Sequence, residues 1–250
     1  MFHLIKRHPI PIRAQFEFVL VLTYAVPARS LITFLTPGLR VDEWNGYGFL
    51  AVAFVQTNHL RPAALPSFLG KSFFLIGYRI FCRYRCLNGR NLRGLRILRS
   101  DTNRKVMAVL GNLLTHYNYQ IAQVEIERST GSLQLHIATP DSSGDVQLNA
   151  NLSHPDGFIP DGSPFSNEQE ARRFTGPMPY TFDYEQETNS IILIQGVRKH
   201  WRPRLIPVTV SKLGFVQQDV FSEAKPVLAG CFYIEGIDYL WRRGVREPLI

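Results

Sequence analysis

The sequence is poor in cysteine, which excludes a fold stapled by disulfide bonds. Its 250 residues include three cysteines, Cys82, Cys86 and Cys231. Cys82 and Cys86 fall in a segment predicted to be one strand, where four residues span roughly 13 Å at ~3.3 Å per residue, too far for one S–S bond. No further cysteine or histidine stands nearby at the spacing that a metal site needs. We expect three reduced thiols, no bound metal and a cytoplasmic protein.

Long apolar runs are missing as well. Pro9 and Pro11 stand where the apolar part of a signal peptide would begin, and the stretch 18–26 is too short to cross a bilayer. We therefore expect neither an export signal nor a membrane span. Internal repeats and low-complexity segments are also lacking.

Familiar catalytic signatures are absent too. The chain has no Gly-x-Ser-x-Gly, no phosphate-binding loop, no HExxH and no pair of carboxylates at a useful spacing. The sequence consequently predicts no cofactor, and no motif identifies a reaction.

Acidic residues are outnumbered: 20 Asp and Glu against 28 Lys and Arg give a formal net charge of +8. The imbalance is strongest from Arg79 to Lys105, where one acid, Asp101, stands among nine basic residues: Arg79, Arg83, Arg85, Arg90, Arg93, Arg96, Arg99, Arg104 and Lys105. Such a face can bind nucleic acid or an anionic surface through phosphate groups. A solvated charged face is the commoner meaning, and no nucleic-acid-binding motif accompanies the run.

What the chain does have is apolar and strand-like sequence. Hydrophobic residues make up 45% and aromatic residues 12%, enough for a packed core, and we expect a single domain over residues 1–250. The turn sequences Asn45-Gly46 and Ser129-Thr130-Gly131 predict hairpins. Strands are predicted at 15–24, 47–57, 72–86, 119–128, 132–139, 145–152, 181–184, 190–197, 204–211 and 227–235.

Three short helices are predicted, at residues 27–35, 102–116 and 167–174. For the second, Asp101 is the expected N-cap. Its expected core-facing stripe comprises Val106, Val109, Leu110, Leu113 and Leu114. For the third, Ser166 and Gln169 predict a capping box. Many strands with few short helices predict a mainly β (α+β) fold, a curved sheet or closed barrel with the helices packed on it.

Two blocks of the chain resemble a known superfamily. Residues 22–55 (LTYAVPARSLITFLTPGLRVDEWNGYGFLAVAFV) and residues 100–127 (SDTNRKVMAVLGNLLTHYNYQIAQVEIE) are similar to elements of acetoacetate decarboxylase-like proteins. With the later element Lys199-His200-Trp201-Arg202-Pro203, the order of segments resembles the uncharacterised YqjF-like branch over nearly the whole chain. The resemblance implies an acetoacetate decarboxylase-like barrel with a pocket for a small molecule.

The resemblance also implies that the decarboxylase chemistry is missing. True decarboxylases carry a Phe-Pro-Lys-Lys pattern whose first lysine forms a Schiff base, and here Tyr117-Asn118-Tyr119-Gln120 stands in its place. A phenol forms no imine, and an amide supplies no neighbouring charge to lower the pKa of an amine. The pocket carboxylate of the decarboxylases falls near Leu75. Another lysine, such as Lys71 or Lys105, does not match the catalytic position.

Four residues are candidates for a site. Tyr119 and His116 are candidate catalytic groups that can polarise a carbonyl or transfer a proton, and Arg79 and Gln120 are candidate ligand-binding groups. The alternatives are a core Tyr119, a surface His116 and an Arg79 on an exposed basic strand. Since Tyr119 and Gln120 are consecutive strand residues, only one of them can face a barrel interior.

Two functions follow as hypotheses. The first is a barrel that binds an unknown small acidic or carbonyl-containing molecule, and acts on it or only holds it, without Schiff-base decarboxylation. The second is a non-enzymatic protein that binds nucleic acid or anionic surfaces through the face from Arg79 to Lys105. Relatives of this fold associate into oligomers, so a homo-oligomer is possible by analogy.

Overall fold

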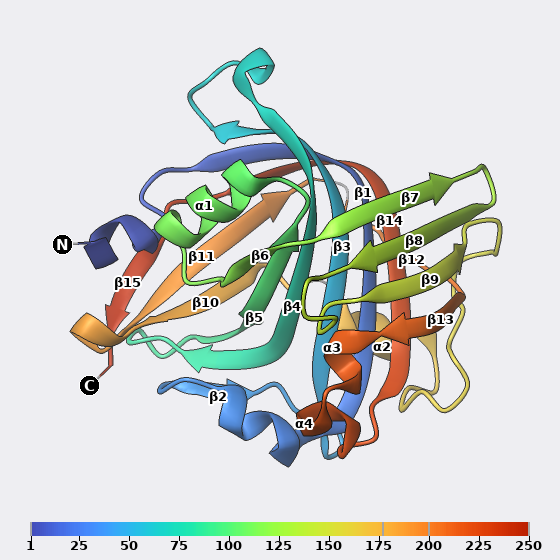
Figure 1. Ribbon diagram of the computed structural model, residues 1–250. Coiled ribbons are helices and arrows are strands. Elements are labelled where there is room, and N and C mark those ends of the chain that lie inside the picture. The colour runs from blue at the N-terminus through green and yellow to red at the C-terminus, as the bar shows by residue number, and fades with distance from the viewer. Residues whose placement is uncertain (1, 177, 200, 250) are drawn as a thin grey trace.

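The computed structural model describes residues 2–176, 178–199 and 201–249, and its strands form two sheets (Figure 1). The larger sheet contains β1 (Ile12–Pro27), β2 (Leu39–Val41), β3 (Tyr47–Pro62), β4 (Lys71–Arg85), β5 (Asn91–Thr102), β6 (Tyr119–Ile121), β10 (Tyr180–Glu185), β11 (Ser190–Arg198), β12 (Arg204–Leu205), β14 (Val227–Trp241) and β15 (Val245–Pro248). The smaller sheet contains β7 (Gln123–Arg128), β8 (Ser132–Ala138), β9 (Val146–Asn151) and β13 (Val208–Leu213).

Short helices connect and cover these strands. The α-helices are α1 (Lys105–Leu114), α2 (Glu168–Thr175), α3 (Gly214–Gln217) and α4 (Asp219–Ser222). The 3-10 helices are η1 (Phe2–Arg7), η2 (Ala28–Phe34), η3 (Ser67–Leu69) and η4 (Gln186–Thr188). Among the described residues, no helix has both the length and the apolar character that crossing a membrane requires.

The larger sheet closes on itself. Its strands follow the order β14, β1, β3, β4, β5, β10, β11, and β11 pairs again with β14 where Gly196 faces Trp241 and Arg198 faces Tyr239. The pairs around this ring are antiparallel except β5 with β10. Closure leaves these strands without a free edge. The predicted mainly β barrel with a few short helices is confirmed.

The central strands bury side chains on both faces, because the small sheet covers the ring from outside. Along β1, Leu20 and Leu22 pack in the core that the ring shares with the small sheet, whereas Val19 and Val21 face the inside of the ring. The same alternation runs along β4, where Ile76, Tyr78 and Ile80 belong to the outer core. Strand side chains alternate between faces, so the odd-numbered residues from Phe73 to Arg79 point into the ring.

Local turn chemistry behaves as the sequence predicts. Asn45 and Gly46 both have positive φ, 49° and 81°, as expected for an Asn-Gly turn. They connect Trp44 and Tyr47, which form an antiparallel β-bridge. Residues 129–131 connect β7 to β8, which pair in antiparallel register.

One predicted strand pattern was incomplete. β5 was not predicted, because Arg93, Arg96 and Arg99 interrupt its apolar pattern. In the structure Arg93 pairs with Asp42 and Arg99 with Asp101. These carboxylates neutralise the arginine charges of the strand, and the sequence pattern does not reveal such partners.

The predicted helix at 102–116 needs two corrections. It begins at Lys105, since Thr102 still belongs to β5, and Asp101 bonds Tyr78 and Arg99 instead of capping it. Its predicted core-facing stripe is in fact exposed: Val106 is 68% and Val109 67% exposed, and Leu110, Leu113 and Leu114 are exposed as well. The buried side of α1 is instead the one that carries the small residues Ala108 and Gly111, because small side chains let the helix pack closely on the barrel.

The helix predicted at 167–174 starts at Glu168, one residue later than predicted. The cap is Asn167, whose side chain accepts a hydrogen bond from the Glu170 N–H, and α2 follows. Glu170 in turn accepts from the Ser166 N–H. The predicted capping by Ser166 and Gln169 is therefore wrong by one position.

Candidate functional site

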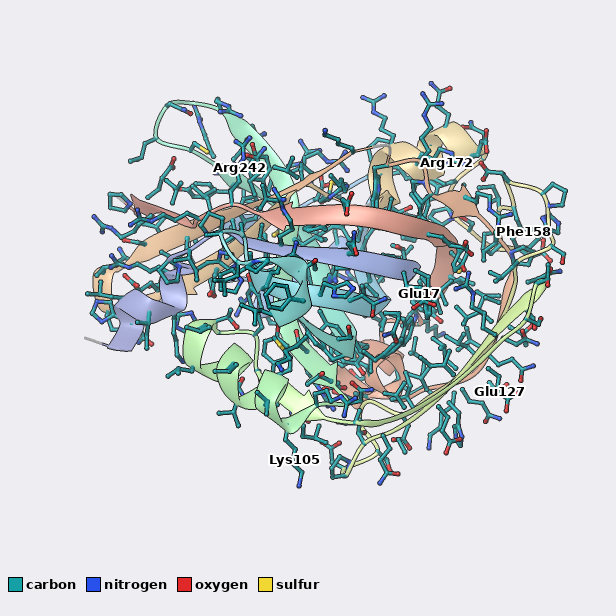
Figure 2. The ribbon with its side chains drawn as sticks, turned by 90° about the horizontal axis from the view of Figure 1, so that it is seen from above. Glu17, Lys105, Glu127, Phe158, Arg172 and Arg242 are labelled. Atoms are coloured by element: carbon teal, nitrogen blue, oxygen red, sulfur yellow. The ribbon has the colours of Figure 1, made fainter. Side chains whose placement is uncertain are left out.

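The ring encloses a cavity of about 890 Å³. The alternate β4 residues Phe73, Leu75, Gly77 and Arg79 line it, as the strand alternation requires. Its open end lies between α1, the β3–β4 hairpin and the segment just before β1, because exposed residues of all three belong to the lining. Lys105, the first residue of α1, belongs to this lining and lies at the outer edge of the molecule in Figure 2.

Arg79 is a charged group inside the cavity, which Arg198 also lines. Its guanidinium folds back over Gly77, where an added Cβ would lie 2.8 Å from Nε and 2.9 Å from Nη2. Arg79 makes no hydrogen bond or ion pair with any described residue, and its Nε is buried without a partner. Burial lowers the pKa of Arg79, while electrostatic interactions with Tyr239, Tyr119 and Tyr117 act to raise it. A guanidinium that lines a cavity without a protein acceptor is a site prepared for an anion.

Tyr119 lies next to Arg79 because three strands are in register. Gly77 on β4 faces Ser100 on β5, and Ser100 faces Tyr119 on β6. Burial raises the pKa of Tyr119 to about 12, against the opposing effects of Arg79 and of a hydrogen bond with Ser100. The phenol is therefore protonated at neutral pH and can donate a hydrogen bond to a carbonyl or carboxylate oxygen.

Other polar groups meet at the same cavity without having been predicted from sequence. The Tyr117 and Tyr119 ring centroids are 6.4 Å apart, and burial raises the pKa of Tyr117 well above its usual value. Trp201 Nε1 and His8 Nδ1 are buried without hydrogen-bond partners, and both residues line the cavity. Burial lowers the pKa of His8. Trp201 belongs to the Lys199–Pro203 element noted in the sequence, whose His200 lies outside the described residues.

His116 and Gln120 are not brought to this cavity. His116 Nδ1 lies 2.7 Å from Asp183 Oδ2, a hydrogen bond that raises the histidine pKa, and the residue does not belong to the lining. Gln120 follows Tyr119 on β6, where it is in register with Asp101, and does not line the cavity either. The structure thus brings together Tyr119 and Arg79, and leaves the other two candidates elsewhere.

The cavity lining is cationic. Among the described residues it includes Arg61, Lys71, Arg104 and Lys105 near the opening and no Asp or Glu. Lys71 and Lys105 are exposed, so neither has the dry surroundings that a Schiff-base lysine needs. The described residues also contain no group of three or more His, Cys, Asp or Glu arranged to hold a metal ion.

The basic run from Arg79 to Lys105 does not form one continuous face. Arg83 and Arg93 both pair with the buried carboxylate of Asp42. Arg99 pairs with Asp101, and Arg96 donates to a backbone carbonyl of η2. The interpretation of Arg79 as part of an exposed basic strand is wrong, because it lines the cavity.

Comparisons with known proteins bear on family and fold. The sequence matches the model of one family, DUF2071, described as an uncharacterized conserved protein (COG2071), over residues 13–230. Comparison with the curated proteins gives no match.

Solved structures share the architecture at low sequence identity. An acetoacetate decarboxylase from Legionella pneumophila has a TM-score of 0.64 at 12% identity, covering 96% of this chain and 88% of that one. An acetoacetate decarboxylase-like enzyme from Sphingomonas wittichii RW1 has a TM-score of 0.61 at 13% identity, covering 96% and 93%. The enduracididine biosynthesis enzyme MppR, in complex with pyruvate, has a TM-score of 0.60 at 13% identity, covering 95% and 90%. These similarities confirm the predicted fold, while the finer YqjF-like assignment stays a prediction.

Proposed function

The chain belongs to the DUF2071 family, and we propose that its barrel binds a small organic carboxylate, held by Arg79. The observation that carries the proposal is the guanidinium of Arg79, which lines an 890 Å³ cavity with no carboxylate in its described lining and no hydrogen-bond partner. An ionised group is rarely left unpaired inside a protein, because its desolvation is not compensated. A ligand carboxylate supplies the missing partner.

Neighbouring groups fit the same ligand. Tyr119 is protonated at neutral pH and adjoins Arg79 through the Gly77–Ser100–Tyr119 row. Its hydroxyl donates a second hydrogen bond to the carboxylate, or to a carbonyl oxygen beside it. MppR, solved with pyruvate, shares this fold and supports an organic carboxylate as the ligand class.

Binding is proposed here in preference to catalysis. The lysines that line the cavity, Lys71 and Lys105, are exposed at its opening, so Schiff-base decarboxylation is not proposed. Acid–base catalysis by Tyr119 together with His116 is not proposed either, since His116 pairs with Asp183 and does not line the cavity.

The test is a comparison of matched ligands by calorimetry. Each carboxylate of a panel, including keto acids, is titrated beside its neutral amide into the wild-type protein and Arg79→Met. We expect the wild type to bind carboxylates and not amides, and the variant to lose about 10- to 100-fold in affinity, the range for a charge-assisted hydrogen bond. Equal binding of acid and amide, or an unaltered Arg79→Met, would refute the proposal.

Nucleic-acid binding is the alternative function. Its geometric support is weak, because Arg83, Arg93 and Arg99 are paired with carboxylates. Binding to DNA or heparin that weakens steeply with salt would restore it.

A further inference from the structure

We infer that the carboxylate ligand is amphiphilic, with a long unbranched apolar chain that runs from Arg79 to the opening of the barrel. This inference rests on the proposed function and adds the part of the ligand that Arg79 does not contact. It is carried by the length, the lining and the opening of the cavity.

The length follows from β4. Lys71 at the opening and Gly77, over which the Arg79 guanidinium folds, both line the cavity, and they are six residues apart on one strand. At ~3.3 Å per residue this separation is roughly 20 Å. Cavities of 300–1,000 Å³ typically enclose drug-sized ligands, so a keto acid of a few carbons leaves most of these 890 Å³ unfilled.

The lining between these ends is apolar in successive rows across the sheet. Phe16 on β1 and Phe73 on β4 are both in register with Thr57 of β3. In the next row of the lining, Val55 of β3 faces both Val19 and Leu75. The two phenylalanines, the two valines and Leu75 all line the cavity. Polar groups that would recognise a second charged or hydroxylated part of a ligand are concentrated at the two ends, so the middle of the path suits methylene groups.

The opening continues this apolar path to the surface. Ile10, Leu69, Val106 and Leu110 line the cavity and are exposed by 47%, 51%, 68% and 47%. A protein surface seldom exposes so many neighbouring large apolar side chains without a use for them. Here they contact the end of a chain that leaves the barrel, and the surrounding Arg61, Lys71, Arg104 and Lys105 attract the anionic ligand before it enters.

The experiment is a chain-length series measured by tryptophan fluorescence, since Trp201 and Trp241 line the cavity. The probes are 3-oxobutanoate, octanoate, dodecanoate and hexadecanoate, each below the concentration at which it forms micelles. Because each buried CH₂ contributes about fourfold in affinity, we expect dodecanoate to bind at least 100-fold more tightly than octanoate. Dodecanol serves as the uncharged control and should bind more weakly than dodecanoate.

A second variant tests the path itself. Leu75→Phe narrows the middle of the cavity and should weaken dodecanoate at least tenfold, while 3-oxobutanoate keeps its affinity. Val245→Phe is the control, because Val245 is 58% exposed and lies outside the lining.

The outcomes separate this inference from the proposed function. Tighter binding of 3-oxobutanoate than of dodecanoate, still lost in Arg79→Met, overturns the long-chain inference and keeps the carboxylate site. If affinity rises with chain length but is the same for dodecanol and dodecanoate, and Arg79→Met does not change it, the apolar path is kept and the carboxylate site is overturned. Absence of any binding overturns both.

Discussion

The ring of Tyr119 lies directly on Gly111 of α1, where an added Cβ would be 2.3 Å from its Cδ2 atom. Tyr119 is therefore fixed from two sides, by the helix above it and by Ser100 beside it. The side chain of Asn112 adds hydrogen bonds to the backbone N–H and C=O of Tyr119. The tyrosine position and the helix position are coupled, so a change in either moves the other.

The first prediction concerns this contact. Gly111→Ala should lower the free energy of unfolding by about 1–2 kcal/mol, because overpacking outweighs the gain in helix propensity from alanine. Chemical denaturation measures the difference. Val109→Ala on the exposed side of the same helix is the control and should change stability by less than about 0.5 kcal/mol. A stabilised Gly111→Ala would show that Tyr119 does not pack on the helix as described.

The second prediction concerns Gly77. Gly77→Ala places a methyl group where the Arg79 guanidinium lies, 2.8 Å from its Nε, so the guanidinium must move. We expect carboxylate affinity to fall about tenfold, with a small change in stability because the far end of an arginine is flexible. In the double variant Gly77→Ala/Arg79→Met the alanine should have no further effect on binding, since the group that it displaces is gone. Additive losses would contradict this coupling.

The third prediction is a pH dependence at the alkaline end. The pKa of Tyr119 is about 12 in the folded protein against ~10 in an unfolded chain, so its contribution to stability is complete below pH ~10 and declines towards pH 12. Replacing Tyr119 with Phe should flatten this decline relative to the wild type, and it should weaken a carboxylate about fivefold through the lost hydrogen bond. Parallel stability curves and an unaltered affinity would exclude the assigned role.

The fourth prediction separates His116 from the site. Its hydrogen bond with Asp183 raises the histidine pKa, so the stabilisation is present below pH ~6.5 and is lost as the pH rises through the raised folded value. His116→Gln should remove this pH-dependent part of the unfolding free energy and leave ligand affinity unchanged. A loss of affinity in this variant would place His116 in the site after all.

Some of the architecture could be predicted from local sequence because its cause is local. The Asn45-Gly46 turn needs positive φ at both residues, which few other pairs adopt. Strand alternation likewise accounts for Tyr78 and Ile80 of β4, which are buried in the outer core. Alternation does not show what the opposite face of the strand contacts. The sequence alone therefore leaves two interpretations of Arg79, an exposed residue or a cavity residue.

Other features depend on contacts that periodicity does not report. The apolar stripe of α1 predicted a buried face, but the small residues Ala108 and Gly111 allow the opposite side to approach the barrel more closely. Tyr117, Trp201 and His8 meet at one cavity only because the ring closes. Tyr119 was found through resemblance to a family, while His116, four residues beyond Asn112 in the same segment, turns towards Asp183.

The most direct test of the account is the free energy of unfolding of Arg79→Met, measured with and without a saturating carboxylate. Because Arg79 has no partner in the unliganded protein, methionine should stabilise that state by about 1 kcal/mol or more, and the ligand should then add little. The wild type should be the less stable protein alone and gain more, about 2.7 kcal/mol at a hundred times the Kd. A variant that is destabilised alone, or that the carboxylate stabilises as much as the wild type, would contradict the assignment of Arg79 as the anion-binding residue.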